Sequence, residues 1–240
     1  DFWADPGKQM VPKAWADMTL GQKSDALYSY TKECLQKLVD AGVDVGMVQV
    51  GNETNGFFCG ERIGADGGWA GIPALMNAGA KAVREICPDA LVALHFTNPE
   101  KAGSYEYYCQ ALASHQVDYD VFASSYYPYW HGTLDNLAAV LTDVAETYGK
   151  KILLAETSYA YTEEDTDFYG NTLGAGVRKS HTRRTQQKSA TGVWVVIFRV
   201  GIGNNITLYT HHSDRCLGII APIYKEFMVK RSWEAFTRKT

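Results

Sequence analysis

The chain has 240 residues, of which 46% are apolar and 12% aromatic, and its formal net charge is −4. This length suffices for one α/β domain or most of a larger one, and the composition is that of a globular rather than a disordered chain. No apolar run approaches the ~20 residues of a membrane span and no signal-peptide pattern opens the chain, so we expect a soluble mature protein with no membrane partner.

Helical and strand-like patterns alternate along residues 20–155. The first helical pattern covers residues 20–41 and is followed by a strand-like run at 47–50. This helical pattern places five residues on one face of the helix: Leu27, Cys34, Leu35, Leu38 and Val39. Three more helices and strands follow in alternation: 72–86 and 91–96, 102–114 and 121–126, 134–148 and 151–155. Such alternation predicts parallel strands with helices outside, and a barrel is preferred because no Gly-x-Gly-x-x-Gly follows a strand.

Two of the predicted strands run directly into a glutamate. Glu53 ends the run Val48-Gln49-Val50-Gly51-Asn52-Glu53, and Glu156 ends Ile152-Leu153-Leu154-Ala155-Glu156. A single glutamate is usually a solvated surface charge. A (β/α) barrel, however, opens to substrate only at the carboxyl ends of its strands, so two carboxylates on that rim indicate glycosidic-bond chemistry.

The other strand ends also carry polar or aromatic groups. Asn52 precedes Glu53, His95 lies in the next strand with Asn98 after it, and Tyr159 follows Glu156. The third strand leads into Tyr126-Tyr127-Pro128-Tyr129-Trp130-His131. His95 alone is more typical of a satisfied core histidine, and the aromatic run is equally consistent with a packed loop. The convergence of four strand ends on one rim favours an active site.

The cysteines number five, an odd count with wide spacing and no Cys-x-x-Cys motif. They are Cys34, Cys59, Cys87, Cys109 and Cys216. Cys34 and Cys109 fall in helical patterns, so buried free thiols are expected rather than a disulfide framework or a zinc site.

Four segments of residues 1–175 carry a resemblance to a known family. They are Asp1-Phe2-Trp3-Ala4-Asp5-Pro6-Gly7-Lys8-Gln9, Val50-Gly51-Asn52-Glu53, Ser125-Tyr126-Tyr127-Pro128-Tyr129-Trp130-His131-Gly132 and Ala155-Glu156-Thr157-Ser158-Tyr159-Ala160-Tyr161-Thr162. In this order they resemble glycoside hydrolase family 53, the arabinogalactan endo-β-1,4-galactanases. The resemblance implies an α/β fold of the (β/α)8 TIM-barrel type, in which the four strands above are strands four to seven.

The resemblance also implies roles for individual residues. Glu53 matches the general acid/base and Glu156 the nucleophile of a retaining mechanism, which needs the two carboxyls about 5–5.5 Å apart. Glu53 must then stay protonated near neutral pH through partial desolvation or the charge of Glu156. The implied substrate-binding residues are Asn52 for the sugar 2-hydroxyl, His95, Tyr126 or Tyr127 to orient the nucleophile, and Trp3, Tyr129 and Trp130 as stacking platforms.

The substrate implied is β-1,4-galactan, hydrolysed outside the cell by a protein that is a monomer when intact and does not bind nucleic acid. No cofactor is required. Asp165, Asp167 and Asn171 resemble a calcium loop of bacterial members, although Tyr169 stands where a histidine is usual. A solvated acidic loop is the favoured alternative for this segment.

The chain departs from the family pattern at both ends. The first three strands would precede Asp1, so we expect a truncated barrel in residues 1–175. Residues 1–170 carry 11 Lys and Arg against 24 Asp and Glu, whereas residues 171–240 carry 12 against 3. Residues 176–240 are therefore treated as a basic segment of uncertain fold, either a frame-shifted remainder of the barrel, which is favoured, or a binder of nucleic acid or acidic polysaccharide.

Three functions remain open from the sequence. A retaining endo-β-1,4-galactanase is favoured. The alternatives are a related barrel hydrolase acting on another β-linked glycan and an inactive carbohydrate-binding remnant that keeps the aromatic platforms.

Overall fold

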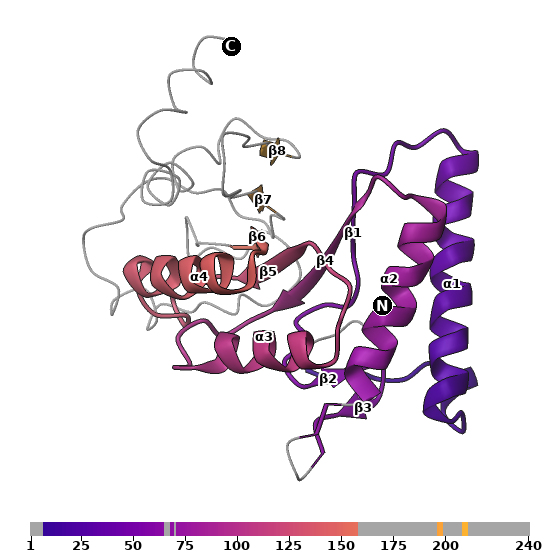
Figure 1. Cartoon of the computed structure of the whole chain (residues 1–240), viewed down its shortest axis with the longest axis horizontal. Coiled ribbons are helices and arrows are strands. Elements are labelled where there is room, and N and C mark those ends of the chain that lie inside the picture. The colour runs from indigo at the N-terminus through magenta and orange to yellow at the C-terminus, as the bar shows by residue number, and fades with distance from the viewer. Residues whose placement is uncertain (1–6, 65–67, 70, 158–195, 199–207, 211–240) are drawn as a thin grey trace, which may run out of the picture.

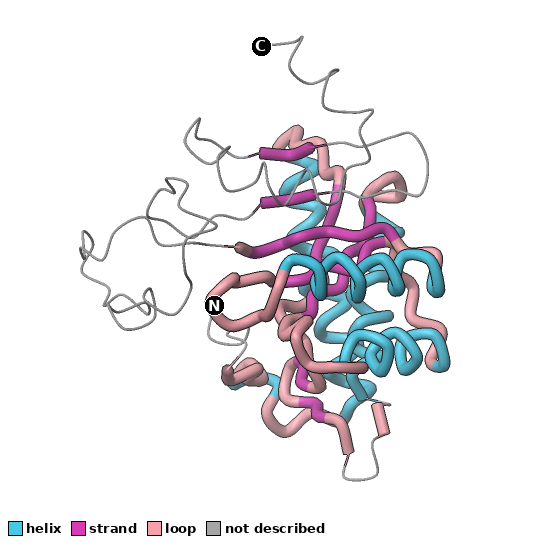
Figure 2. The backbone as a smooth tube through the Cα atoms, turned by 90° about the vertical axis from the view of Figure 1, so that its left-hand side faces the viewer, coloured by secondary structure: helices cyan, strands magenta, loops and turns pink. Residues whose placement is uncertain are grey.

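The computed structural model describes residues 7–64, 68–69, 71–157, 196–198 and 208–210 (Figure 1). Its main body is a parallel sheet of four strands in the order β1-β4-β5-β6. These are β1 (Met47–Gln49), β4 (Leu91–Phe96), β5 (Val121–Ser125) and β6 (Lys151–Glu156). The helices are α1 (Leu20–Asp40), α2 (Gly71–Ile86), α3 (Ser104–Ser114) and α4 (Leu134–Tyr148), and they lie on the outer side of the strands (Figure 2). The predicted strand and helix alternation is confirmed as an incomplete α/β barrel.

Short elements complete the described part of the chain. A 3-10 helix, η1 (Lys13–Trp15), precedes α1, and a hairpin of β2 (Phe57–Phe58) and β3 (Glu61–Arg62) follows β1. A second antiparallel pair consists of β7 (Val196–Phe198) and β8 (Leu208–Thr210). The predicted domain boundary near residue 175 lies outside the described residues. Among those that are described, no helix is long and apolar enough to cross a bilayer.

The two faces of the sheet carry side chains of different size. Toward the helices, large apolar and aromatic side chains form the main core, where Phe96 and Phe122 stack with ring centroids 4.9 Å apart. The inner face carries smaller side chains, with Ala93, Ala123 and Leu153 at its centre. Because successive side chains of a strand alternate between faces, His95 follows Ala93 on the inner face and Ser125 follows Ala123. The inner face therefore becomes polar at the carboxyl end of the strands.

Helix α1 begins at a capping box in which Thr19 and Gln22 satisfy each other's backbone and side-chain groups. Leu27 and Leu35 are buried on its core face, as predicted. Two residues that the pattern places on the same face are not buried: Leu38 is 44% exposed and Val39 is 39% exposed. The apolar stripe continues beyond the point where any described element covers the helix, so periodicity alone overstates the buried face.

The described cysteines are free thiols, as expected. Cys59, Cys87 and Cys109 are buried, whereas Cys34 in α1 is only half-buried. Burial raises the pKa of the Cys109 thiol to about 12, which keeps it protonated and unreactive.

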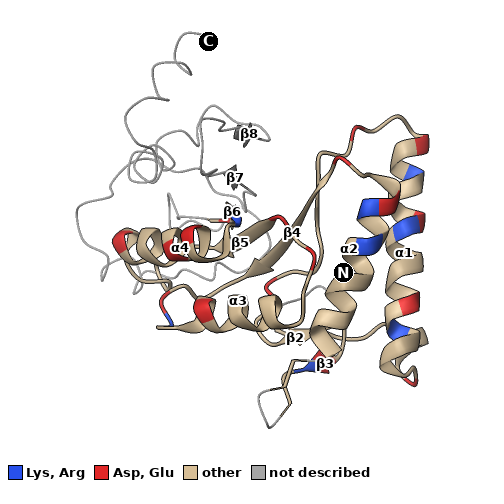
Figure 3. Cartoon of the chain, viewed as in Figure 1, with Lys and Arg blue, Asp and Glu red and all other residues tan. Residues whose placement is uncertain are grey.

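An ion-pair cluster ties helix α2 to the amino ends of the strands. Arg84 donates to Asp118 at 2.8 Å and 3.0 Å and to Asp120 at 2.9 Å. Asp120 in turn accepts from the backbone N–H of Val92 at 2.8 Å. Figure 3 shows that charged residues otherwise lie mainly on helices and loops, while β4 and β5 carry none. The cluster stands at the end of the sheet opposite to that of Glu53 and Glu156.

Candidate active site

Glu53 is held by a loop that continues β1 along the end of β4. Gly51 turns the chain with a φ of 87°, which an L side chain rarely adopts. The backbone N–H of Thr54 then donates to the carbonyl of His95 at 2.8 Å, and Gln9 Nε2 donates to the carbonyl of Asn52 at 2.7 Å. Between these anchors Glu53 itself has a φ of 46°, a strained conformation that costs about 1–3 kcal/mol and aims its carboxylate toward the sheet.

Glu156 is the last residue of β6 and pairs in register with Ser125 of β5, after an irregularity between Ser124 and Ser125. Its backbone carbonyl accepts from the N–H of Tyr126 at 2.8 Å. The side chain is 23% exposed, so the carboxylate is accessible at the carboxyl end of β6. Glu53 thus lies in the loop after the first strand of the four-stranded sheet, and Glu156 ends the last strand.

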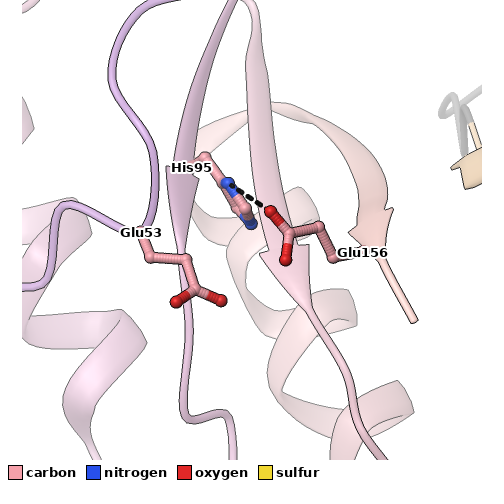
Figure 4. A group of neighbouring side chains, drawn as sticks. All are labelled: Glu53, His95 and Glu156. Carbon is pink, nitrogen blue, oxygen red and sulfur yellow. Dashed lines mark ion pairs between the residues drawn. The ribbon is translucent and has the colours of Figure 1, made fainter. Parts of the chain in front are cut away.

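The structure brings the two carboxylates together over one histidine. One oxygen of Glu53, one of Glu156 and a ring nitrogen of His95 all lie within 4.8 Å of one another. His95 Nδ1 is 3.9 Å from Glu156 Oε1, and Figure 4 shows the ring between the two acidic side chains. The distance of at most 4.8 Å between one oxygen of Glu53 and one of Glu156 is near the separation of about 5–5.5 Å in retaining glycosidases. It is below the roughly 6.5–9.5 Å of inverting glycosidases.

The surroundings of Glu53 favour its protonated form. Burial is the largest influence and raises its pKa, and the charge of Glu156 raises it further. Hydrogen bonds from Ser125 and Thr97 act in the opposite direction and lower the pKa. The net result is a raised pKa, which is what a carboxyl acting as an acid near neutral pH requires.

His95 is fully buried, with none of its surface exposed. Burial lowers its pKa to about 4, so the ring is neutral near pH 7. Its ring nitrogens contact Ser125, Asn52 and Gln49. His95 therefore lies buried beneath the two glutamates, and its expected part in binding substrate stays a prediction.

The structure distinguishes the two candidate tyrosines. Tyr127 donates its hydroxyl to Glu156 Oε2 at 2.7 Å. Tyr126 is 2% exposed, and its hydroxyl donates instead to the carbonyl of Gly132 at 3.0 Å. Burial raises the pKa of Tyr127, and its hydrogen bond to Glu156 raises it further, so the phenol remains a donor. Tyr126 supports the loop, and Tyr127 contacts the second carboxylate.

The aromatic loop after β5 has one exposed ring and one buried ring. Trp130 is 47% exposed and meets Tyr127 edge-on, with ring centroids 5.9 Å apart. Tyr129 is only 7% exposed and its ring lies against Trp130, with centroids 6.0 Å apart; its expected role as a stacking platform stays a prediction. His131 accepts from the backbone N–H of Tyr127 at 3.1 Å and was missed from the sequence. The only sequence signal for it was its place in the loop motif.

Ser125 is a second residue that the sequence did not single out. It ends a strand whose residues are all buried and therefore read as core. In the structure its hydroxyl contacts both Glu53 and His95. Only the register of β4 against β5 could have revealed this, because Ser125 is far from both partners in the sequence.

Several expected site residues lie outside the described part of the chain: Trp3, Asp165, Asp167 and Asn171. Within the described part, one group of side chains has the spacing for a metal ion, namely Glu53, His95 and Glu156. Both ring nitrogens of His95 already face protein partners, and both carboxylates accept hydroxyl hydrogen bonds. These three side chains are therefore already engaged with protein groups in the structure.

The sequence matches a family model described as Glycosyl hydrolase family 53 over residues 1–209. An endo-beta-1,4-galactanase of Bacillus subtilis (strain 168) is 59% identical over 172 residues, which cover 72% of this chain and 39% of that protein. An arabinogalactan endo-beta-1,4-galactanase of Cellvibrio japonicus (strain Ueda107) is 37% identical over 183 residues, covering 72% of this chain and 48% of the relative.

The chain is also similar to solved structures of galactanases and of this family. The Ignisphaera aggregans GH53 catalytic domain aligns with a TM-score of 0.67 at 36% identity, covering 75% of this chain and 49% of that one. A structure of fungal beta-1,4-galactanases aligns with a TM-score of 0.61 at 26% identity, covering 68% and 51% respectively. The predicted barrel class is confirmed by this likeness. The chain spans about half the length, or less, of the relatives it matches.

Proposed function

The chain belongs to glycosyl hydrolase family 53, and on that premise we propose that it carries the catalytic machinery of a retaining endo-β-1,4-galactanase. Glu156 attacks the anomeric carbon, and Glu53 protonates the leaving glycosidic oxygen. A galactosyl ester on Glu156 forms as the bond to the leaving group breaks. Glu53, now ionised, then removes a proton from water, which attacks the ester and restores both carboxyls.

The observation that carries this proposal is the spacing of the two carboxylates. One oxygen from each carboxylate lies within 4.8 Å of the other, which is nearer to the retaining separation of about 5–5.5 Å than to the roughly 6.5–9.5 Å of inverting enzymes. The environments also differ in the required sense: Glu53 has a raised pKa, while Glu156 accepts the hydroxyl of Tyr127. Trp130 offers an exposed ring beside Tyr127 on which an apolar sugar face could stack.

The test is hydrolysis of a panel of polysaccharides by the 240-residue chain. We expect shortened galactan chains, with products that initially carry the β-anomer, and little release from mannan, xylan or cellulose. Reducing-end assays measure the rate and NMR of early products gives the anomer. Preferential cleavage of another glycan would favour the related hydrolase, and galactan binding without cleavage would favour the binding remnant. An initial α-anomer would contradict retention.

Removal of the Tyr127 hydroxyl should slow the nucleophilic step without unfolding the chain. The hydroxyl donates to Glu156 at 2.7 Å and holds the carboxylate in one orientation. We expect Tyr127→Phe to lower kcat on galactan by about 10- to 100-fold, because a hydrogen bond to a charged group contributes about 1.5–3 kcal/mol. Tyr126→Phe is the matched control, since that hydroxyl reaches Gly132 instead. Equal losses in both variants would contradict the assignment.

A further inference from the structure

A continuous set of hydrogen bonds runs beneath Glu53 across three strands. Ser125 Oγ lies 2.5 Å from Glu53 Oε1, and His95 Nε2 lies 2.9 Å from Ser125 Oγ. On the other side of the ring, His95 Nδ1 is 3.2 Å from Gln49 Nε2. Ser125 and His95 are both fully buried. The set therefore connects the partly buried carboxylate of Glu53, through the two buried residues, to Gln49 at an exposed position of β1.

The chemistry of the groups fixes the direction of these bonds when Glu53 is ionised. A carboxylate only accepts, so Ser125 must donate its single hydroxyl hydrogen to Glu53. The serine oxygen can then accept from His95, which requires the proton of the neutral ring on Nε2. Nδ1 is left as an acceptor, and the amide N–H of Gln49 is the donor that faces it.

Asn52 fits the same direction after a half-turn of its amide. Its Oδ1 stands 3.0 Å from His95 Nδ1. With Nδ1 as an acceptor, the amide nitrogen of Asn52 must replace Oδ1 at that position and share the single lone pair of Nδ1 with the Gln49 N–H; the two amide orientations differ little in shape. The opposite tautomer would donate from Nδ1 to Asn52 and draw the Ser125 hydroxyl away from Glu53. The ring is thus held in place in either case, but only one tautomer supports an ionised Glu53.

We propose that Ser125 is a positioning residue for the acid/base Glu53, and that His95 holds Ser125 in the orientation that stabilises the carboxylate left when Glu53 gives up its proton. The proposal rests on the function assigned to Glu53 above. It adds a buried residue whose hydroxyl hydrogen-bonds to the acid/base Glu53. Its effect is to make Glu53 a stronger acid than its buried surroundings alone would allow.

Other groups around Glu53 act on it as well. Glu156 faces it from β6, Thr97 from the segment after β4, and Tyr127 from the loop after β5. Tyr105 of α3 is close enough for the charge of Glu53 to raise its pKa. Since none of these groups changes when Ser125 is replaced, the contribution of Ser125 can be isolated by one substitution.

The test is the pKa of Glu53 in the Ser125→Ala variant of the 240-residue chain. This pKa is measured by an NMR titration with carboxyl-labelled glutamate. Loss of the hydrogen bond that lowers this pKa should raise it by about one pH unit. The matched control is Ser124→Ala, because Ser124 is equally buried but hydrogen-bonds to Tyr105 at 2.6 Å. Ser125→Cys, a weaker donor of similar shape, should give an intermediate value and serves if the alanine variant melts early.

Kinetics provide a second readout. Because Glu53 must be protonated to act as an acid, a higher pKa should move the basic limb of the kcat/KM profile to higher pH. Hydrolysis of galactan should fall about tenfold, and an activated aryl β-galactoside with a good leaving group should be affected far less. His95→Leu should shift the limb in the same direction, and His95→Gln, which keeps an N–H donor, should restore part of it.

An unchanged or lowered Glu53 pKa in Ser125→Ala, or an equal shift in Ser124→Ala, would overturn the proposal. The two proposals can fail separately. If the unsubstituted chain cleaves no galactan, the proposed function fails, while the NMR titration still decides whether Ser125 stabilises the ionised Glu53.

Discussion

Glu156→Ala is expected to lower galactan hydrolysis by about 10⁴-fold or more, the scale on which loss of a covalent nucleophile affects an enzyme. One oxygen of Glu156 lies within 4.8 Å of one oxygen of Glu53, which places it where the nucleophile is needed. The side chain is partly exposed at the end of β6 and belongs to no ion pair with Lys or Arg in the described residues. Its loss should therefore leave the thermal melting temperature nearly unchanged. Reducing-end assays and a thermal melt on the same preparation measure both effects.

A small anion provides the control for this substitution. The space left by the carboxylate should admit azide, which can attack the anomeric carbon of an activated aryl β-galactoside from the same side as Glu156. Formation of the α-galactosyl azide would identify the missing group as the nucleophile. Glu146→Ala, at an exposed position in α4, should retain full activity. Substantial galactan cleavage by Glu156→Ala would refute the assignment.

Glu53→Ala is expected to separate substrates by their leaving groups. Galactan needs a proton on the departing sugar oxygen, and its cleavage should fall by about 10²- to 10⁴-fold. An activated aryl β-galactoside needs little protonation, so its first bond cleavage should survive. Without Glu53 as base the galactosyl ester on Glu156 should accumulate, giving a burst of aryl alcohol followed by slow turnover. Rapid-mixing absorbance measurements record the burst.

The pH profile gives an independent check on Glu53. In the unsubstituted chain the basic limb of kcat/KM reflects the raised pKa of this carboxyl, because activity is lost as the acid ionises. In Glu53→Ala that limb should disappear for the activated substrate. If both substrates lost the same factor and the limb remained, another group would have to be the acid.

The sequence predicts the alternation of elements well because their ends carry strong local signals. Helix α4 begins after the capping Thr133 and ends at Gly149, whose φ is 64°, and its predicted bounds agree with the structure. The two glutamates could likewise be found, because a polar residue that closes an apolar strand has a defined place in a barrel. The last turn of α1 could not be predicted, since its exposure depends on what covers it.

The remaining site residues depend on register, which one sequence does not display. The choice between Tyr126 and Tyr127 depends on which hydroxyl reaches Glu156. Glu156 comes level with Ser125 only because β6 carries one extra residue between the pairs Ser124–Leu154 and Ser125–Glu156, and such a shift exchanges the faces of a strand. Ser125 looks like core in the sequence, and only its alignment beside His95 and Glu53 makes it part of the site.

The Arg84 cluster has a consequence for how such a chain can change over time. It anchors α2 to Asp118 and Asp120 at the amino ends of the strands, whereas the proton chemistry occupies the carboxyl ends. Substitutions that change the pKa of Glu53 leave the Arg84 ion pairs in place. Substitutions around Arg84 can raise thermal stability without changing the pKa of Glu53. Selection for a new pH range and selection for a new temperature range can thus act on separate sets of residues.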